Sequence, residues 1–195
     1  MQTRRRRPLP GIDESKPFLP VQIAVLTVSD TRTEADDRSG RTLVERIEAA
    51  GHRVAEKKIV EDDADRIEAE LRRWIADPEV DVVIATGGTG VTGRDVTPEA
   101  VEPLFEKRME AFSTLFTMVS YPKIGTSAIQ TRATAGVANS TYIFCVPGSP
   151  GACKDAWDEI LVHQLDYRYR PCNFVEILPR LDEHLRREKA KGATT

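Results

Sequence analysis

The 195-residue sequence lacks any apolar run long enough to cross a membrane. A transmembrane helix needs roughly 20 consecutive apolar residues, so the sequence does not predict an integral membrane protein. The basic start, Arg4 to Arg7, is followed by Pro-Leu-Pro-Gly and charged residues, whereas a secretory signal would continue with an apolar segment. We therefore expect a cytoplasmic protein with no membrane partner.

Cysteine and histidine are scarce, with three residues of each. Cys145, Cys153 and Cys172 are odd in number and contain no CxxC spacing, so the sequence predicts neither a disulfide framework nor a zinc site. The three histidines are scattered and form no HExxH pattern. We expect reduced cysteines and look for the chemistry among other side chains.

The net charge of −3 is unevenly distributed along the chain. The first 20 residues carry +3 and residues 180–195 carry +2, which leaves −8 for residues 21–179. Because phosphate neutralisation by basic residues supplies most nucleic-acid binding, an acidic body argues against a nucleic-acid partner. We expect a flexible basic arm over residues 1–20, one domain over 21–179 and a charged tail over 180–195.

Apolar runs alternate with amphipathic segments through the first half of the chain. The β-branched runs at 22–29, 52–60 and 80–86 predict strands. Between them, apolar residues at helical spacing predict one helix with Ser39 as its N-cap and a second that ends before Pro78. Strands alternating with helices predict an α/β fold with a mostly parallel sheet covered on both faces.

The second half predicts three further helices and a pair of strands. Thr97-Pro98 predicts a helix start, with Thr97 as the N-cap and Pro98 in the first turn, and residues 108–120 predict a helix with a strongly apolar face. Two short strands are expected within 132–146, on either side of Asn139-Ser140, and Ser149-Pro150 predicts the start of another helix. We expect the apolar face of helix 108–120, with Phe112, Leu115 and Phe116, to pack at or near a subunit interface.

Polar residues follow the predicted strands where each one ends. In an open parallel sheet, ligands bind outside the carboxyl ends of the strands. Those ends carry Ser29-Asp30, Glu61-Asp62-Asp63, Thr86 to Gly90 with Asp95 beyond, and Pro147-Gly148-Ser149. A simple turn would explain any one of these segments, but polar residues at all of these strand ends together predict a ligand-binding site.

The glycine-rich segment after the third strand matches two phosphate-binding motifs only in part. Gly88-x-Gly90-x-x-Gly93 has the dinucleotide spacing but does not follow the first strand. The P-loop spacing is also present, but Arg94 and Asp95 stand where Lys and Ser or Thr are required. Glycines still allow backbone N–H groups to approach an anion closely, and Thr86 and Thr89 add hydroxyl donors. A phosphate-bearing ligand is therefore predicted.

Two carboxylates near this loop favour a metal ion. Asp62 and Asp95 would repel a phosphate unless a divalent cation lay between them. Mg²⁺ commonly bridges one or two carboxylates to substrate phosphates, so the pair indicates magnesium-assisted phosphoryl or nucleotidyl transfer. The alternative is structural, with Asp62 or Asp63 capping the next helix and Asp95 holding the loop in place.

At these residues the sequence resembles the MoaB/MogA proteins of molybdenum cofactor biosynthesis. The resemblance covers nearly the whole body, and TGGTG joined to RDVTPEA is its most specific part. The AGVAN and RPCNF segments resemble the MoaB branch in particular. The matching segments are TVSDTR (27–32), DDRSG (36–40), TGGTG (86–90), RDVTPEA (94–100), AGVANST (135–141), PGSP (147–150) and QLDYRYRPCNF (164–174).

The resemblance implies a three-layer αβα fold and a homotrimer or homohexamer. It also implies a reaction in which molybdopterin attacks the α-phosphate of ATP in the presence of Mg²⁺, giving adenylyl-molybdopterin and pyrophosphate. Asp62 and Asp95 match the two acidic residues that the family uses. Residues 94–98 keep the form found in active members, which favours an enzyme. Other proteins of the pathway are further expected partners.

Two alternative functions stay open. One is a non-catalytic protein that binds or passes on molybdopterin, and the other is an unrelated nucleotide-sugar or phosphate-binding domain.

The resemblance also implies which residues line the substrate crevice. Thr131 stands where serine is common in the family. The expected substrate-binding residues are Ser29, Asp30, Ser39, Gly40, Thr86, Gly87, Gly88, Thr89, Gly90, Thr131, Pro147, Gly148 and Ser149.

Overall fold

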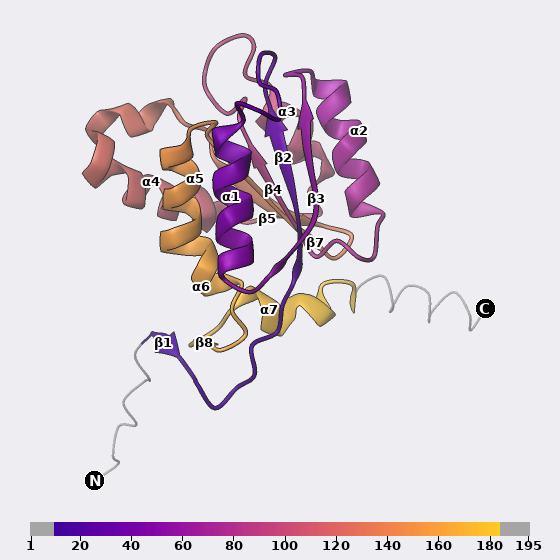
Figure 1. The fold of residues 1–195 in the computed structure, drawn as a ribbon, viewed down its shortest axis with the longest axis vertical. Coiled ribbons are helices and arrows are strands. Elements are labelled where there is room, and N and C mark those ends of the chain that lie inside the picture. The colour runs from indigo at the N-terminus through magenta and orange to yellow at the C-terminus, as the bar shows by residue number, and fades with distance from the viewer. Residues whose placement is uncertain (1–9, 184–195) are drawn as a thin grey trace, which may run out of the picture.

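The computed structural model describes residues 10–183, which contain a six-stranded central sheet between two layers of helices (Figure 1). The strand order is β3-β2-β4-β7-β6-β5. The expected α/β fold with a mostly parallel sheet is confirmed. The strands are β2 (Gln22–Val28), β3 (Arg53–Val60), β4 (Val82–Thr86), β5 (Lys107–Arg108), β6 (Thr134–Ala138) and β7 (Thr141–Val146).

Four neighbouring strands are parallel and share one direction. β2 pairs in parallel with β3 and with β4, and β4 pairs in parallel with β7. β6 and β5 then continue the sheet in antiparallel pairing. The turn from β6 to β7 at Asn139 and Ser140 has φ of 44° and 71°, as a tight two-residue hairpin turn requires. The carboxyl ends of the four parallel strands therefore meet at one edge of the sheet.

Helices cover both faces because successive strand residues point to opposite sides. Ile23 and Val25 pack with α1, α4 and α5 on one face. Ala24 and Leu26 pack with α2 and α3 on the other, and Figure 1 shows the same two layers. The helices are α1 (Arg38–Ala49), α2 (Ala64–Ile75), α3 (Thr97–Val101), α4 (Glu110–Ile124), α5 (Pro150–Ala156), α6 (Val162–Gln164) and α7 (Phe174–Ile177).

Two helix starts differ from the sequence-based expectation. The N-cap of α1 is Asp37, whose carboxylate accepts the N–H of Gly40 at 2.8 Å, and Ser39 lies within the first helical turn. The N-cap position of α3 is Val96, and Thr97 is the first helical residue. In both cases the hydroxyl predicted to cap the helix donates to a loop carbonyl near the strand ends instead.

The expected helix at 108–120 is α4, and it extends to Ile124 through Pro122. Because Pro122 has no N–H to donate to the carbonyl four residues earlier, this last turn lacks one helical hydrogen bond. The apolar face expected at an interface divides into two. Phe112 and Phe116 are buried in the core, whereas Leu115 lies on the outer side, where it is 46% exposed. The expectation was therefore wrong for the two phenylalanines.

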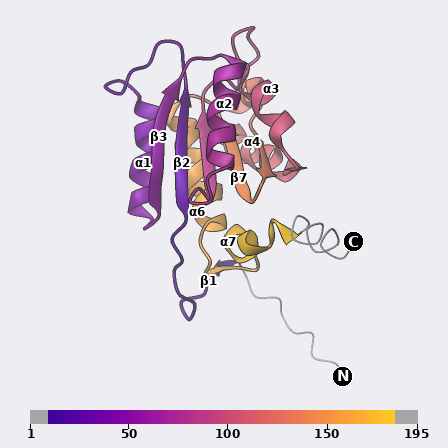
Figure 2. The ribbon, with the colours of Figure 1, turned by 90° about the vertical axis from the view of Figure 1, so that its right-hand side faces the viewer.

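Residues 10–20, expected to belong to a flexible arm, contact the end of the body opposite the parallel strand ends. β1 (Gly11–Ile12), which lies below the main sheet in Figure 2, pairs antiparallel with β8 (Tyr169–Arg170). Phe18 packs against His52, with 5.0 Å between ring centroids. The Arg4–Arg7 cluster and most of the tail, from residue 184 on, lie outside the described residues. None of the helices within residues 10–183 is long and apolar enough to cross a bilayer.

His52 lies buried beneath this N-terminal segment. Its Nδ1 accepts the backbone N–H of Val21 at 3.3 Å, and its ring is 6.0 Å from that of Trp157. Burial lowers the pKa of His52 to about 4 against the opposing charge of Asp166. The folded protein therefore keeps His52 neutral at pH values where an unfolded chain would protonate it.

We expect this histidine to make the folded state sensitive to acid. Because its folded pKa lies below its unfolded value, the stabilisation present at pH 7 is lost as the pH falls from about 6.5 to about 4, on the order of 3 kcal/mol. His52→Gln should remove this part of the pH dependence in urea unfolding curves. The exposed His163→Gln should retain it. Identical pH slopes for His52→Gln and the unaltered chain would contradict the assignment.

Candidate functional site

The ends of β2, β4 and β7 converge on Gly87. Its N–H donates to the carbonyl of Val146 at 3.1 Å, and its φ is 111°. A Cβ at this position would lie 2.1 Å from the carbonyl oxygen of Val28, and one at Gly148 would lie 3.0 Å from the Cα of Gly87. Only glycine permits three strand ends to approach so closely.

Gly88 brings the next part of the loop against Asp62, which follows β3. The φ of Gly88 is 59°, and a Cβ there would lie 2.7 Å from Oδ1 of Asp62 and 2.3 Å from Oγ1 of Thr97. Thr97 holds the loop by donating its hydroxyl to the carbonyl of Gly87 at 2.9 Å and its N–H to that of Gly88 at 3.0 Å. The misassigned cap residue is therefore part of the site.

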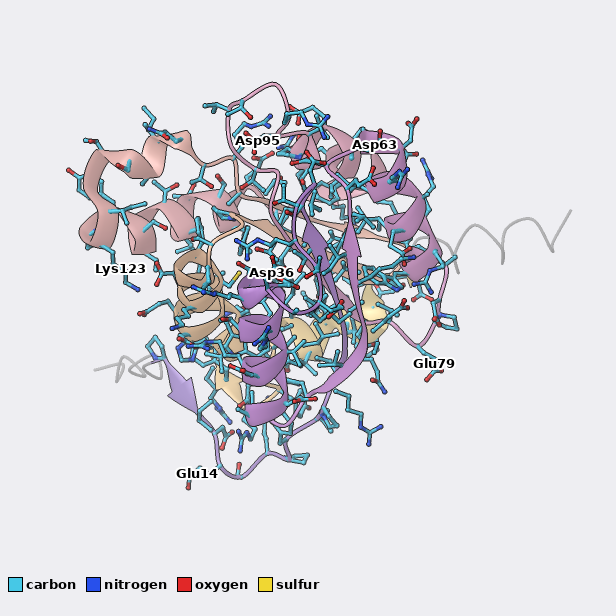
Figure 3. The ribbon with its side chains drawn as sticks, turned by 45° about the horizontal axis from the view of Figure 1, so that its top comes forward. Glu14, Asp36, Asp63, Glu79, Asp95 and Lys123 are labelled. Atoms are coloured by element: carbon cyan, nitrogen blue, oxygen red, sulfur yellow. The ribbon has the colours of Figure 1, made fainter. Side chains whose placement is uncertain are left out.

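Asp95 folds back over the same loop. Its Oδ2 accepts the N–H of Thr92 at 2.9 Å and the hydroxyl of Thr92 at 2.6 Å. These bonds, with the hydroxyl contributing most, lower the pKa of Asp95. A Cβ at Gly90 would lie 2.7 Å from Oδ2 of Asp95. The carboxylate is thus held ionised beside the glycine loop, at the upper end of the molecule in Figure 3.

Asp62 has the opposite electrostatic character. Burial raises its pKa, and the negative charges of Asp95 and Asp30 raise it further, against a 3.4 Å hydrogen bond from the N–H of Val96. Asp30 accepts the N–H of Asp62 at 3.0 Å and pairs with Arg94, whose Nε lies 3.1 Å away. This guanidinium contributes most to lowering the pKa of Asp30. An added cation would relieve the repulsion at Asp62.

The neighbouring Asp63 has a separate task. Its carboxylate accepts the N–H of Arg66 at 3.0 Å and caps α2. The structural alternative, in which an aspartate caps this helix, is therefore confirmed for Asp63, whereas Asp62 is directed at Gly88. The structural alternative for Asp95 is also confirmed, because Asp95 holds the loop through its bonds with Thr92.

Arg132 holds the glycine loop through hydrogen bonds, and the sequence analysis did not predict this role. Its guanidinium donates to the carbonyls of Gly90 and Asp95, each at 2.7 Å, and its N–H donates to that of Thr89 at 2.9 Å. Arg132 also pairs with Glu99 on α3. The only signal in the sequence was its position directly after Thr131.

A cleft of about 670 Å³ lies above these strand ends. It is large enough for a drug-sized ligand, for which pockets of roughly 300–1,000 Å³ are usual. The predicted residues that line it are Ser29, Gly87, Gly88, Thr89, Gly90, Asp95, Thr131, Pro147, Gly148 and Ser149.

The other predicted residues lie beneath or beside this cleft. Asp30 borders a neighbouring groove along β3, and Asp62 lies behind Gly88. Ser39 donates its hydroxyl to the carbonyl of Gly148 at 3.1 Å, and the buried Gly40 supplies an N–H to the cap of α1. The buried Thr86 donates to the carbonyl of Pro147 at 2.9 Å. These three support the lining instead of forming it.

The opposite wall of the cleft was not predicted. It comes from α4 and the following turn η2 (Gly125–Gln130), where no motif marks the residues. Thr131, at the end of this wall, has a buried hydroxyl with no hydrogen-bond partner among residues 10–183. Asp155 lies at the rim and is paired with Lys123 of α4, at 2.6 Å. The unpredicted lining residues are Val28, Thr31, Arg32, Phe116, Ser120, Ile124, Ser127, Gln130, Gly151, Ala152 and Asp155.

The oxygen donors at the site fit the expected magnesium ion only if substrate phosphates complete its coordination. Within residues 10–183, no group of three or more His, Cys, Asp or Glu side chains is arranged to hold a metal by itself. Mg²⁺, however, is commonly bound through one or two carboxylates together with substrate phosphates and water. The carboxylates of Asp62, which Asp95 repels, and of Asp95, which Thr92 keeps ionised, adjoin Gly88 and Gly90 and fit that mode.

Residues 24–167 match the family model described as "Probable molybdopterin binding domain". The chain is 51% identical over 160 residues to Molybdenum cofactor biosynthesis protein B of Escherichia coli (strain K12), covering 82% of this chain and 94% of that protein.

Solved structures are similar over a comparable range. A crystal structure of Molybdenum cofactor biosynthesis protein B has 40% sequence identity and a TM-score of 0.75, covering 77% of this chain and 94% of that chain. The tungsten cofactor synthesizing protein MoaB from Pyrococcus furiosus has 35% identity and a TM-score of 0.67, over 72% of this chain and 90% of that chain. The three-layer arrangement expected from the resemblance is thereby confirmed.

We expect Gly88→Ala to disturb the site directly. The added methyl group meets Asp62 and Thr97, and alanine at positive φ adds backbone strain, together costing about 1–3 kcal/mol. Urea unfolding measures this loss. Gly93→Ala is the matched control, because a Cβ there has no atom within 4 Å, and it should change stability by less than about 0.5 kcal/mol. Equal effects of the two substitutions would contradict the geometry.

Proposed function

The chain belongs to the family of Molybdenum cofactor biosynthesis protein B and has a role in the biosynthesis of that cofactor, and from this premise we propose that it catalyses the Mg-ATP-dependent adenylylation of molybdopterin. In this reaction an oxygen of the terminal phosphate of molybdopterin attacks the α-phosphorus of ATP. A new P–O bond forms, the bond between the α-phosphorus and the bridging oxygen breaks, and pyrophosphate leaves with the bond electrons. The products are adenylyl-molybdopterin and pyrophosphate.

The observation that carries this proposal is the placement of two carboxylates against one glycine loop. Asp62 lies against Gly88 and Asp95 against Gly90, although the aspartates are 33 positions apart in the sequence. Glycines at the lining leave room for phosphate oxygens to approach the backbone N–H groups. Carboxylates alone would repel such a ligand, so their presence supports transfer chemistry that includes a cation.

Asp62 and Asp95 would hold the magnesium ion together with the substrate phosphates. When bound, Mg²⁺ would neutralise phosphate charge and favour the leaving of pyrophosphate. Asp95 is suited to this role because its hydrogen bonds with Thr92 keep its carboxylate ionised and fixed. Asp62 supplies a second oxygen donor whose repulsion by Asp95 a cation would relieve.

The remaining residues would bind and orient the two substrates. The backbone of residues 87–90 and the hydroxyls of Ser29, Thr131 and Ser149 would contact them from the cleft wall. The buried hydroxyl of Thr131 has no protein partner in the described part of the chain, so a ligand could supply one. Arg132 and Thr97 would act as positioning residues, because they hold the loop carbonyls and keep the N–H groups in place.

A second candidate function is binding or handing on of molybdopterin without turnover. The specific observation in its favour is that Asp95 is already engaged with Thr92, which gives the residue a purely structural use. The two functions differ in pyrophosphate release, which only the adenylyltransferase produces.

We expect Asp62→Asn and Asp95→Asn each to reduce pyrophosphate release from molybdopterin and Mg-ATP by at least about 100-fold, because each removes a carboxylate that would hold the cation at the substrate phosphates. A coupled pyrophosphate assay measures the rate. Asp63→Asn is the matched control, since asparagine also caps a helix well, and it should retain the rate. Release that survives both active-site substitutions would contradict their roles, whereas tight binding without release would favour the second candidate.

We further propose that the chain forms a homo-oligomer, a trimer or a pair of trimers, through the outer side of α4 and η2. Leu115, Met118, Tyr121 and Ile124 are each 46–64% exposed there, and Ile129 is 85% exposed. Contiguous exposed apolar side chains of this kind mark interaction surfaces. The same helix forms one wall of the cleft through Phe116 and Ser120, so assembly would also shape the site.

Met118→Glu should shift the assembled species toward monomer, because it places a charge in an apolar contact. Light scattering coupled to size-exclusion chromatography measures the mass. Ile177→Glu, at an exposed apolar residue of α7 at the opposite end, should leave the mass unchanged. A monomer in the unaltered chain would contradict the proposal.

A further inference from the structure

The basic side chains around the cleft differ in whether they already form ion pairs with acidic side chains. Arg94 is paired with Asp30, and Lys123 with Asp155 and Glu159. Arg132 is paired with Glu99 and donates hydrogen bonds to the loop carbonyls. Arg32 is different, because among the ion pairs of residues 10–183 it takes part in none, although it lines the cleft.

Arg32 is nevertheless held in place. It lies in the loop after β2, where its backbone N–H donates to Oγ of Ser29 at 3.2 Å. Its Nη2 lies 3.4 Å from the carbonyl oxygen of Gly148 across the cleft floor. Asp36, whose pKa it helps to lower, is bonded chiefly to the N–H and hydroxyl of Thr33. A guanidinium has five N–H groups, and most of those of Arg32 remain available.

The groove along β3 provides a contrast. It contains more cationic side chains than the cleft does, and Arg32 borders both hollows. Lys57 pairs there with Glu34 and Asp37, and Lys58 and Arg73 pair with Glu70. Since those charges are neutralised by adjacent carboxylates, the groove offers an anion little attraction. An abundance of basic residues therefore does not identify the anion site. Arg32 is uncompensated and borders both hollows, and its contact with Gly148, which lines only the cleft, directs it to the cleft.

We propose that Arg32 binds a phosphate group of the ligand in the cleft and makes the protein selective for phosphorylated ligands. This inference deepens the proposed function and rests on it for the identity of the ligand. The phosphate comes either from the terminal phosphate of molybdopterin or from the phosphate chain of ATP. The planar fork of arginine donates two parallel hydrogen bonds to phosphate oxygens, which a lysine does not reproduce.

The location of Arg32 supports a binding role instead of a metal-related one. It approaches from the β2 loop and the Gly148 side, whereas Asp62 and Asp95 adjoin Gly88 and Gly90 of the glycine loop. A phosphate held by Arg32 would therefore be anchored on the other side of the converging strand ends. One anionic ligand would then have two separate anchor points in the cleft.

Binding measurements on Arg32→Gln test the proposal without requiring turnover. Titration calorimetry would use three probes, namely inorganic pyrophosphate, Mg-ATP and molybdopterin. The matched control is Arg41→Gln, because the guanidinium of Arg41 also donates to a single carbonyl, that of Ala35 at 2.9 Å, but does not line the cleft. Arg32→Lys keeps the charge and loses the fork. Thermal unfolding checks that each variant is folded.

We expect Arg32→Gln to weaken at least one phosphorylated probe by about 10-fold to 100-fold, the usual size for a lost charge-assisted hydrogen bond. Arg32→Lys should recover part of the loss, and Arg41→Gln should bind as the unaltered chain does. Weakening confined to Mg-ATP or to molybdopterin identifies the source of the phosphate. Treatment of molybdopterin with a phosphatase should abolish the difference between the unaltered chain and Arg32→Gln if its phosphate is the one bound.

Equal affinities of Arg32→Gln and the unaltered chain for all three probes would overturn the proposal, as would failure of the unaltered chain to bind any of them. Failure of the proposed function has a different signature. In that case the affinities would depend on Arg32 as expected, but no pyrophosphate would be released from molybdopterin and Mg-ATP.

Discussion

The close approach of three strand ends at Gly87 is the constraint on which the rest of the site depends. The Val28 carbonyl occupies the space that any side chain at residue 87 would need, and Gly148 contacts the same backbone from β7. This packing brings the loops after β2, β4 and β7 to one point. Thr97 and Arg132 then hold the glycine-loop carbonyls, so that the loop keeps one conformation beside the cleft.

The carboxylates around this loop have different roles. Asp63 caps α2 and thereby leaves its neighbour Asp62 directed at Gly88. Asp62 is disfavoured as an anion by burial and by nearby negative charge, whereas Asp95 is stabilised as one by Thr92. A folded protein gains no stability from the repulsion at Asp62, which is the pattern expected where function and stability compete. The arrangement is consistent with a proposed cation site completed by substrate phosphates.

Much of the fold could be predicted from the sequence, because apolar periodicity reports directly on which faces are buried. The parallel strands, their polar ends and the hairpin at Asn139 follow from such local signals. Ser39 and Thr97 were misassigned as caps, because a hydroxyl near a helix start can serve either the helix or a loop carbonyl, and only tertiary packing decides. The α4 wall, Arg132 and Arg32 depend on non-local contacts, and Phe112 and Leu115 differ only in which side of one helix they occupy.

The central claim is that the cleft holds phosphates with a divalent cation between Asp62 and Asp95. Crystals grown with molybdopterin, a non-hydrolysable ATP analogue and Mn²⁺ in place of Mg²⁺ would test it most directly, because Mn²⁺ is located by its anomalous scattering. The account predicts an anomalous peak next to the carboxylates of Asp62 and Asp95, with phosphate density beside the loop from Gly87 to Gly90. A fully occupied ligand with no peak there, or with the metal in the groove along β3, would contradict it.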